Sequence, residues 1–413
     1  MSNIDLPSSQ TVLLLHGPKK PYEVTAGYAI PEVKSENEVL VRAETFGLNP
    51  IDWKAPDFNF GIPVLPYIAG RELVGRVVKP SKPDSRLREG DQVLVISTDY
   101  RDMRKAGFQE YVVSSDFNTV RIPPNVPRQP GATIGVAYVA AVLSLGVCMG
   151  VDFSSILDGP DLLQVVRSVE PSLLPQDVRQ ECLSGIQDRE RAVPGDWLAI
   201  WGGSSTSANL AVQLARLAGL RVVTIVDKAK HGLRLADHEV LRPDLLVDSH
   251  SPARAVEIIR ANVGKKLRFA LDTTGRDSAK SLLDALTPDD ELEGIKVGEE
   301  KTTTTTTTTP PPSPPDTPRR QRSQSAHLVG LTGLPKGQAP EGVAYHTVPI
   351  KIFHEVPAVG EALVLWLERL LESGLVKPPE VLAAEQGFDG VNRGLDRMRK
   401  GEISGGRMVV DIS

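Results

Sequence analysis

The chain has 413 residues, of which 40% are hydrophobic, so length and composition predict two or three domains with sizeable cores. Its net charge of -5 and isoelectric point near 5.9 give no reason to expect nucleic-acid binding. No uninterrupted apolar run reaches about 18 residues, which argues against a membrane span, and the polar residues 1–10 lack the pattern of a signal peptide. We therefore expect a cytoplasmic protein with free thiols at Cys148 and Cys182, too few for a four-thiolate zinc site.

Residues 11–127 read as short strands separated by glycine and proline turns. The apolar runs that predict these strands are 39–43, 73–78, 92–96 and 108–113. Their spacing favours an all-β section, a small and partly open barrel. From about residue 131 the period changes: 132–149 predicts a long apolar helix, and 152–191 is polar and partly helical.

A strand–turn–helix–strand unit begins near residue 194 and is the most informative stretch of the chain. The runs 197–201 and 221–226 predict buried strands, and 208–219 predicts an amphipathic helix between them. Such a unit sets a pyrophosphate on the helix N-terminus, where free backbone N–H groups and the helix dipole bind it. The small residues of the turn are Gly202, Gly203, Ser204, Ser205, Thr206 and Ser207. Because the turn is not a full G-x-G-x-x-G pattern, an ordinary βαβ unit without a nucleotide stays open as the alternative.

The second strand of this unit ends in residues with opposing implications for the cofactor. Asp227 stands where an acid bonds the ribose hydroxyls of NAD and repels a 2′-phosphate. Lys228 and Lys230 follow at once, and cations at that loop are what a 2′-phosphate needs. If Asp227 turns away or pairs with Lys230, Lys228 is left for the phosphate.

A low-complexity segment at 299–325 interrupts the βα pattern. Eight threonines run into a proline-rich stretch that cannot build a core, so we expect a disordered surface loop inside the nucleotide domain that is dispensable for folding. A strand restarts at 327–331. The tail then predicts helices over 361–373 and 390–399 and a final strand over 407–412, which returns to the first domain.

Several motifs in this order resemble the medium-chain dehydrogenase/reductase family. The stretch 49–54 is similar to the N-P-x-D-x-K motif of its quinone-reductase and enoyl-reductase branches, and 69–77 to the G-H-E-x-x-G-x-V motif of its zinc branch. Residues 90–93, 107–111 and the ending 394–410 match as well. The resemblance implies an α/β protein in which a Rossmann domain, a doubly wound parallel sheet, is inserted into a GroES-like β-barrel domain. Its expected parts are 1–130, the Rossmann domain 131–344, and a C-terminal return at 345–413.

The departures from the zinc branch carry a second implication. Phe46-Gly47 stands where the first cysteine ligand is expected, and Arg71 replaces the histidine. A guanidinium has no lone pair to give a metal. The resemblance therefore implies no zinc and no metal site, and it favours hydride donation to an activated double bond or a quinone, which needs only donors for the developing oxyanion.

The resemblance also supplies the candidate catalytic residues. Lys54 is similar to the lysine that faces cofactor and substrate in related reductases, and Asp52 and Trp53 of the same stretch are expected to border the cofactor. A solvent-exposed Lys54 paired to Asp52 or Asp57 is the alternative. Tyr138, on the helix that lines the domain cleft in the family, is a candidate proton donor, and its alternative is an aromatic residue of the core.

The chain most resembles fungal members of the family, among them trans-acting enoyl reductases that work beside polyketide synthases. The expected function is NADPH-dependent reduction of a small-molecule or carrier-bound enoyl substrate, without excluding NADH, with a polyketide synthase as a possible partner. A quinone oxidoreductase-like enzyme and a non-catalytic nucleotide-binding protein are the alternatives. We expect a monomer or homodimer that binds neither nucleic acid nor membranes.

Overall fold

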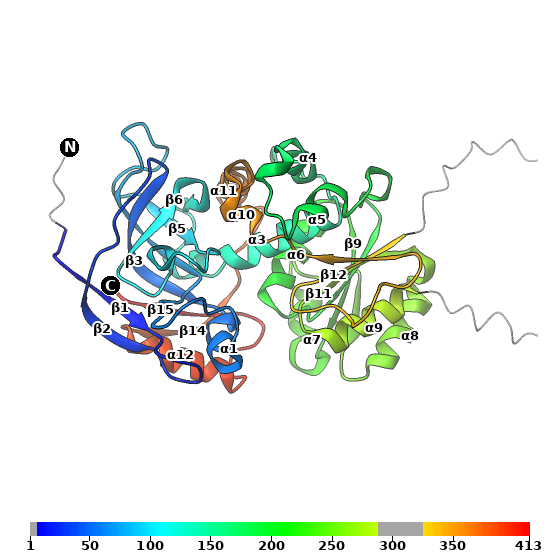
Figure 1. The fold of residues 1–413 in the computed structure, drawn as a ribbon. Helices are drawn as coiled ribbons and strands as arrows, with labels where there is room; N and C mark the ends of the chain where they lie inside the picture. Colours follow the sequence, from blue (N-terminus) through cyan, green and yellow to red (C-terminus); the bar gives the residue numbers. More distant parts are fainter. Residues whose placement is uncertain (1–5, 288–324) are drawn as a thin grey trace, which may run out of the picture.

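The computed structural model describes residues 6–287 and 325–413 and divides into a β-rich half and an α/β half (Figure 1). Both ends of the chain contribute to the β-rich half, where the red C-terminal elements lie beside the blue N-terminal ones. The middle of the chain forms the other half. Apart from Ser325, the low-complexity segment predicted at 299–325 lies outside the described residues.

The α/β half is built on a six-stranded sheet in which every pairing is parallel. The strands lie in the order β10-β9-β8-β11-β12-β13, so the order reverses between β8 and β11. This is the doubly wound Rossmann arrangement, and it confirms the predicted fold class. The strands are β8 (Trp197–Trp201), β9 (Arg221–Val226), β10 (Leu245–Asp248), β11 (Leu267–Asp272), β12 (Ala326–Gly330) and β13 (Val343–Thr347).

Alternation along the strands explains why helices cover both faces of this sheet. In β8, Leu198 and Ile200 enter one apolar cluster, whereas Ala199 and Trp201 enter another on the opposite face. The helices of this half are α4 (Leu162–Ser168), α5 (Arg179–Ser184), α6 (Thr206–Leu217), α7 (Lys228–Asp237), α8 (Pro252–Asn262) and α9 (Arg276–Leu286). Both faces of this central strand are therefore buried, as is typical of a parallel sheet.

The β-rich half contains a seven-stranded sheet assembled from both ends of the chain. Along its main path the order is β14-β15-β3-β4-β5-β7, with β6 paired to β3. The last strand is central, because β15 pairs antiparallel with β3 and parallel with β14. The strands are β3 (Glu38–Leu48), β4 (Glu72–Lys79), β5 (Gln92–Ile96), β6 (Tyr111–Ser115), β7 (Thr119–Arg121), β14 (Val381–Gln386) and β15 (Arg407–Asp411), while β1 (Gln10–Leu14) and β2 (Glu23–Tyr28) form a separate pair.

Helices complete this half, and one of them was not expected from the sequence. The section predicted as all-β contains α1 (Pro50–Phe58), which begins after Asn49 with proline at its first position. An N-capping asparagine followed by proline is a helix-start signal, so the sequence did carry the information. The other helices are α2 (Arg128–Gly131), α3 (Gly135–Leu143), α10 (Ile352–Glu355), α11 (Pro357–Glu372) and α12 (Asp389–Arg399).

The long apolar helix predicted over 132–149 is α3 continued by a π-helical turn at Ser144–Cys148. Among the described residues, one helical stretch, Arg128–Cys148, is long and apolar enough to cross a membrane, and 89% of its most apolar window is buried inside the protein. Uninterrupted apolar runs alone had not revealed this stretch. Its burial is that of a core helix packed against α6.

Candidate active site

A cleft of about 320 Å³ separates the two halves at the point where the strand order reverses. Ligands of open α/β sheets bind outside the carboxyl ends of the strands at this switch point. From the Rossmann half the cleft is lined by Gly202, Ser204, Ser205, Thr206, Thr273 and Thr274, and from the β-rich half by Pro50, Lys54, Met398 and residues 403–407. It therefore joins the glycine turn to the candidate lysine.

Two close backbone approaches require the glycines of the turn. Gly202 has a φ of +79°, and a Cβ there would stand 2.4 Å from the Oγ1 atoms of Thr273 and Thr274. A Cβ on Gly203 would stand 2.0 Å from Cγ2 of Thr224 on β9. The turn thus packs backbone directly against the neighbouring strands, which leaves room above it for a bound group.

The turn ends in a well-formed start of α6. The Ser205 hydroxyl accepts the Ala208 N–H at 3.1 Å and donates to Thr273 Oγ1 at 2.9 Å. The first N–H groups of a helix have no acceptor within it, so those of Thr206 and Ser207 are available to an anion. This cradle fits the pyrophosphate of a dinucleotide. Of the predicted turn residues, Gly203 and Ser207 do not themselves line the cleft.

Lys54 reaches the cleft because of how α1 starts. The Asn49 N–H donates to Asp52 Oδ2 at 2.7 Å, which fixes the first turn of the helix. Lys54 is half-buried and lines the cleft, with Nζ 5.6 Å from the centre of the Trp53 ring. Within the described part of the chain it pairs with neither Asp52 nor Asp57, since Asp57 binds Arg399 at 2.7 Å instead.

Asp52 and Trp53, predicted to border the cofactor, are not among the residues that line the cleft. Asp52 is 2% exposed, and burial raises its pKa to about 7. Trp53 packs on the core of the β-rich half and near Phe58, with ring centres 6.3 Å apart. Their part is to build the helix that presents Lys54.

The Tyr138 side chain belongs to the core, which corrects its candidacy as a proton donor. It is 1% exposed and its hydroxyl donates to the Leu363 carbonyl at 3.0 Å. Its ring lies 6.1 Å from that of Trp366. Burial raises the pKa of this phenol well above its usual value. Its proton is held in the hydrogen bond to the Leu363 carbonyl of α11.

At the end of β9, Asp227 acts as the N-cap of α7. Its Oδ1 accepts the backbone N–H of Lys230 at 3.0 Å, and its Oδ2 lies 3.7 Å from His250 Nε2. The predicted pairing with Lys230 is therefore made to the main chain and not to the ammonium group. Lys228 and Lys230 are exposed, while the Lys228 N–H donates to Asp248 at 3.0 Å.

Sequence reasoning missed the residues that complete the cleft from two other segments. Thr273 and Thr274 follow β11, whose carboxyl end lies beside that of β8, so their position after a strand was an available signal. The segment 403–407 is held over the Rossmann half by α7: His231 Nε2 bonds Ser404 Oγ at 3.0 Å, and Arg234 donates to the Gly405 carbonyl at 2.5 Å. The segment belongs to the family-like ending 394–410, but that resemblance did not place it in the cleft.

The two positions where zinc ligands are expected are occupied by side chains that do not bind zinc. Phe46 is fully buried against Phe108, and Arg71 is 4% exposed beside Tyr67 and Tyr100. Within residues 6–287 and 325–413, two groups of side chains approach closely enough to share a metal, and neither lines the cleft. They are Cys148 with Glu181 and His346, and Asp227 with Asp248 and His250.

Comparisons with known proteins agree with this fold. Residues 35–124 match the family model "Alcohol dehydrogenase GroES-like domain". The chain is 28% identical to the trans-enoyl reductase mycC of Thermothelomyces thermophilus over 98% of this chain and 97% of that protein. Among solved structures, the CurK enoyl reductase superposes with a TM-score of 0.64 at 15% identity, covering 98% of this chain and 99% of the other. A putative NADPH:quinone reductase from Bacillus thuringiensis gives 0.67 at 17%, with coverages of 98% and 99%.

Proposed function

Since this chain is an oxidoreductase of the medium-chain dehydrogenase/reductase family, we propose that it reduces the activated double bond of an enoyl thioester with NADPH and without zinc. The observation that carries the proposal is the interdomain cleft, where the Lys54 ammonium faces the same space as the glycine turn. A cation beside a phosphate cradle suits a cofactor-dependent reductase. The trans-enoyl reductase named above, similar along its whole length, supports the enoyl class.

The chain's own residues divide the work within this cleft. When bound, NADPH supplies the hydride. The N–H groups at the start of α6 hold the pyrophosphate, and Thr273 keeps the turn in place by donating to the carbonyls of Trp201 and Gly202 at 3.0 and 3.1 Å. Lys54 contributes a positive charge that stabilises either the cofactor or the oxygen on which negative charge develops.

The preference for NADPH is supported by the geometry at the end of β9. Asp227 has one oxygen committed to the α7 cap and the other facing His250, whereas the Lys228 and Lys230 side chains are exposed. Lys228 and Lys230 are the side chains proposed to contact a 2′-phosphate here, since His250 lies beside the carboxylates of Asp227 and Asp248. Charge-assisted contacts from these two ammonium groups favour a phosphate at this position.

We further propose that the substrate arrives on a polyketide synthase and that the enzyme acts in trans. The support is the full-length likeness to a trans-enoyl reductase. A free small thioester then serves as a model substrate with a raised KM.

The test is NADPH oxidation by the purified full chain with a pantetheine enoyl thioester and with a series of quinones, before and after dialysis against a chelator. The proposal expects turnover of the thioester, weaker turnover of quinones, and no loss on chelation. Turnover of quinones alone would assign the chain to the quinone-reductase class. Binding of NADPH without turnover of any acceptor would indicate a non-catalytic nucleotide-binding protein.

A further inference from the structure

Residues 403–407 form one wall of the cleft. All five line it, together with Gly202 of the glycine turn and Lys54 of α1. The segment comes directly before β15 and is irregular up to Arg407, the first residue of that strand. An irregular segment presents a fixed surface to a ligand only when side chains from its surroundings hold it in place.

The end of this wall is anchored in the β-rich half. Arg407 is 3% exposed and lies 3.2 Å from the Glu72 carboxylate. Its guanidinium also donates to the Leu48 carbonyl at 2.8 Å and to Asn49 Oδ1 at 2.7 Å. Because Asn49 caps the helix that carries Lys54, this end of the wall is fixed to the same element as the candidate lysine.

The middle of the wall is anchored in the other half, on α7. His231 Nε2 and Ser404 Oγ are 3.0 Å apart, and Arg234 donates to the Gly405 carbonyl at 2.5 Å. Arg234 also lies 3.1 Å from the exposed carboxylate of Glu380. His231 and Arg234 are three residues apart and therefore share one face of the helix. The wall thus makes hydrogen bonds to both halves of the protein.

The backbone of the wall packs directly against α7 at Gly405. This glycine has a φ of +85°, and a Cβ there would stand 2.7 Å from Arg234 Nη2 and 3.0 Å from His231 Nδ1. A side chain would push the wall and the helix apart, so the close approach requires glycine. Burial, Arg234 and Lys230 lower the pKa of His231, which favours a neutral ring beside the Arg234 guanidinium.

The contacts to the wall are separate from the contacts proposed for a 2′-phosphate, although α7 provides both. The helix begins at Lys228 after its cap Asp227, whereas His231 and Arg234 lie further along it. Neither His231 nor Arg234 lines the cleft. Any effect of these two side chains on a ligand in the cleft must therefore pass through residues 403–407.

We propose that His231 and Arg234 are positioning residues, which hold residues 403–407 against the dinucleotide bound in the cleft, and this rests on the function proposed above. They touch neither cofactor nor substrate. When one of the two hydrogen bonds is lost, the wall moves away from the Rossmann half and its contacts with the cofactor weaken. NADPH and NADH share the part of the molecule that lies in the cleft, so both lose affinity by the same factor.

The test is a fluorescence titration of the purified full chain with NADPH and with NADH, without any acceptor. His231→Phe and Arg234→Met each remove one hydrogen bond to the wall, and each should raise both Kd values by about three- to tenfold. Arg234→Lys should keep part of the affinity. Ser404→Ala removes the partner of His231 from the other side, so adding it to His231→Phe should cost less than it costs in the wild type.

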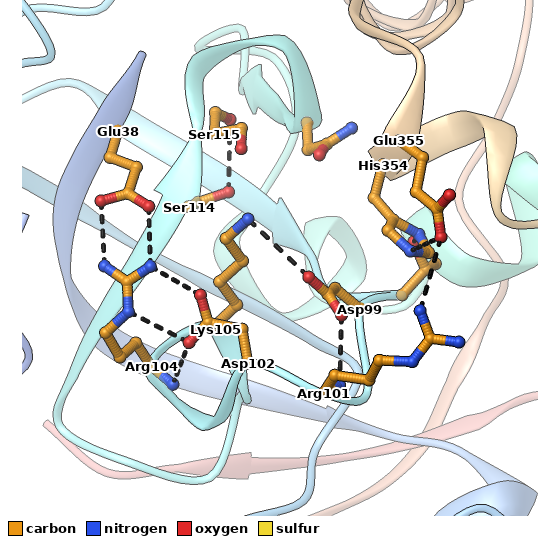
Figure 2. A network of polar contacts seen from close by, with 12 residues as sticks. Glu38, Asp99, Arg101, Asp102, Arg104, Lys105, Ser114, Ser115, His354 and Glu355 are labelled. Carbon is orange, nitrogen blue, oxygen red and sulfur yellow. Dashed lines mark hydrogen bonds and ion pairs between the residues drawn. The ribbon is translucent and has the colours of Figure 1, made fainter. Parts of the chain in front are cut away.

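Arg104 provides the matched control for a merely structural arginine (Figure 2). It also ties a loop to a neighbouring element, because it donates to both oxygens of Glu38 on β3 at 2.9 and 2.8 Å. It does not line the cleft and does not contact residues 403–407 or α7 in any bond described here. Arg104→Met should therefore lower Tm and leave both Kd values unchanged.

Two results overturn the positioning role. One is a lower Tm with both Kd values unchanged in His231→Phe and Arg234→Met, as in the control. The other is a loss of NADPH affinity alone, which would place the effect at the 2′-phosphate. Should His231→Phe fail to fold, Arg234→Met and Ser404→Ala carry the same expectation. The expected Kd changes in a protein that reduces no enoyl thioester would refute the proposed function and retain the positioning role, whereas a wild type that binds neither cofactor refutes both.

Discussion

The two sides of the cleft are built in different ways. On the Rossmann side, the Gly202–Thr206 turn is made of consecutive residues whose backbone we propose binds the cofactor, and each glycine is required by a close contact with β9 or with the loop after β11. On the other side, the lining residues come from three separate segments: Pro50 and Lys54 of α1, Met398 of α12, and residues 403–407. Consecutive backbone sites leave a pattern in the sequence, whereas sites assembled from distant side chains do not.

The largest effect is expected from adding a side-chain atom where the glycine turn packs against its neighbours. Gly203→Ala places a Cβ 2.0 Å from Thr224 Cγ2, and such overpacking should destabilise the protein by about 1–3 kcal/mol. It should also displace the turn, so the loss of NADPH affinity should be the largest of the variants discussed here. Differential scanning calorimetry and NADPH fluorescence titration measure the two effects. Thr224→Ser removes the clashing methyl group, so the double variant should recover part of both, and a failure to do so would locate the strain elsewhere.

Replacing Lys54, which lines the cleft between the two halves, should have the next largest effect. Lys54→Ala should lower turnover on the order of tenfold or more, because one electrostatic donor leaves the cleft. Steady-state kinetics combined with the Kd for NADPH then decides which side Lys54 serves: a rise in Kd assigns it to the cofactor, and a fall in kcat alone assigns it to the acceptor. Lys19→Ala is the control, since that exposed lysine lines a separate groove. Unchanged kinetics in Lys54→Ala would return Lys54 to the surface.

On the Rossmann side, we expect exposed side chains after β9 to decide which cofactor binds, with little effect on the fold. Replacing Lys228 and Lys230 together by alanine should weaken NADPH roughly tenfold, through loss of charge-assisted phosphate contacts, and leave NADH nearly unchanged. The measurement is kcat/KM with each cofactor. The exposed Lys280 of α9, changed to alanine, serves as the control. A wild-type preference for NADH would mean that Asp227 holds the ribose.

A further prediction concerns the pH dependence of stability and not the activity. Burial raises the pKa of Asp52 to about 7, well above about 3.9 in an unfolded chain. The folded protein therefore holds a proton that the unfolded chain releases, and the resulting stability is fully present below pH about 4 and is lost as the pH rises through about 7. Asp52→Asn should flatten the fall in Tm between about pH 4 and 7. The exposed Asp84→Asn should leave that fall unchanged, and an identical slope in Asp52→Asn would contradict the assignment.

These contrasts explain which strands and helices could be predicted from the sequence. The predicted strand at 197–201 coincides with β8, and 221–226 with β9, because buried parallel strands are uninterrupted apolar runs. Helix α6 begins at Thr206, two residues before the predicted 208, because the Ser205 cap and not the apolar period sets its start. Helix α1 was not predicted because its surroundings were interpreted as strands, although Asn49-Pro50 is a helix-start signal.

The site was less readable than the fold. The turn and Lys54 were found because both belong to short linear motifs. Thr273, Thr274 and residues 403–407 reach the cleft only through the topology of the sheets. Tyr138 was misplaced because a helix that lines a cleft also has a face in the core, and only its contact with Leu363 shows which face the ring occupies.

The position of β15 has a consequence for the order in which the protein is made. This strand separates β14 from β3 and pairs with residues 45–48, so the edge of β3 that it covers waits for residues 408–411 to be synthesised. All strands of the six-stranded sheet, by contrast, lie within 197–347 and precede it. During translation the Rossmann half is complete while the first half still exposes an unpaired strand edge, the kind of surface to which chaperones and other nascent chains bind. We expect ribosome-stalled chains that end before residue 407 to protect the Rossmann half from protease and leave the N-terminal half cleavable, and equal protection of both halves would show that the β-rich sheet forms without its last strand.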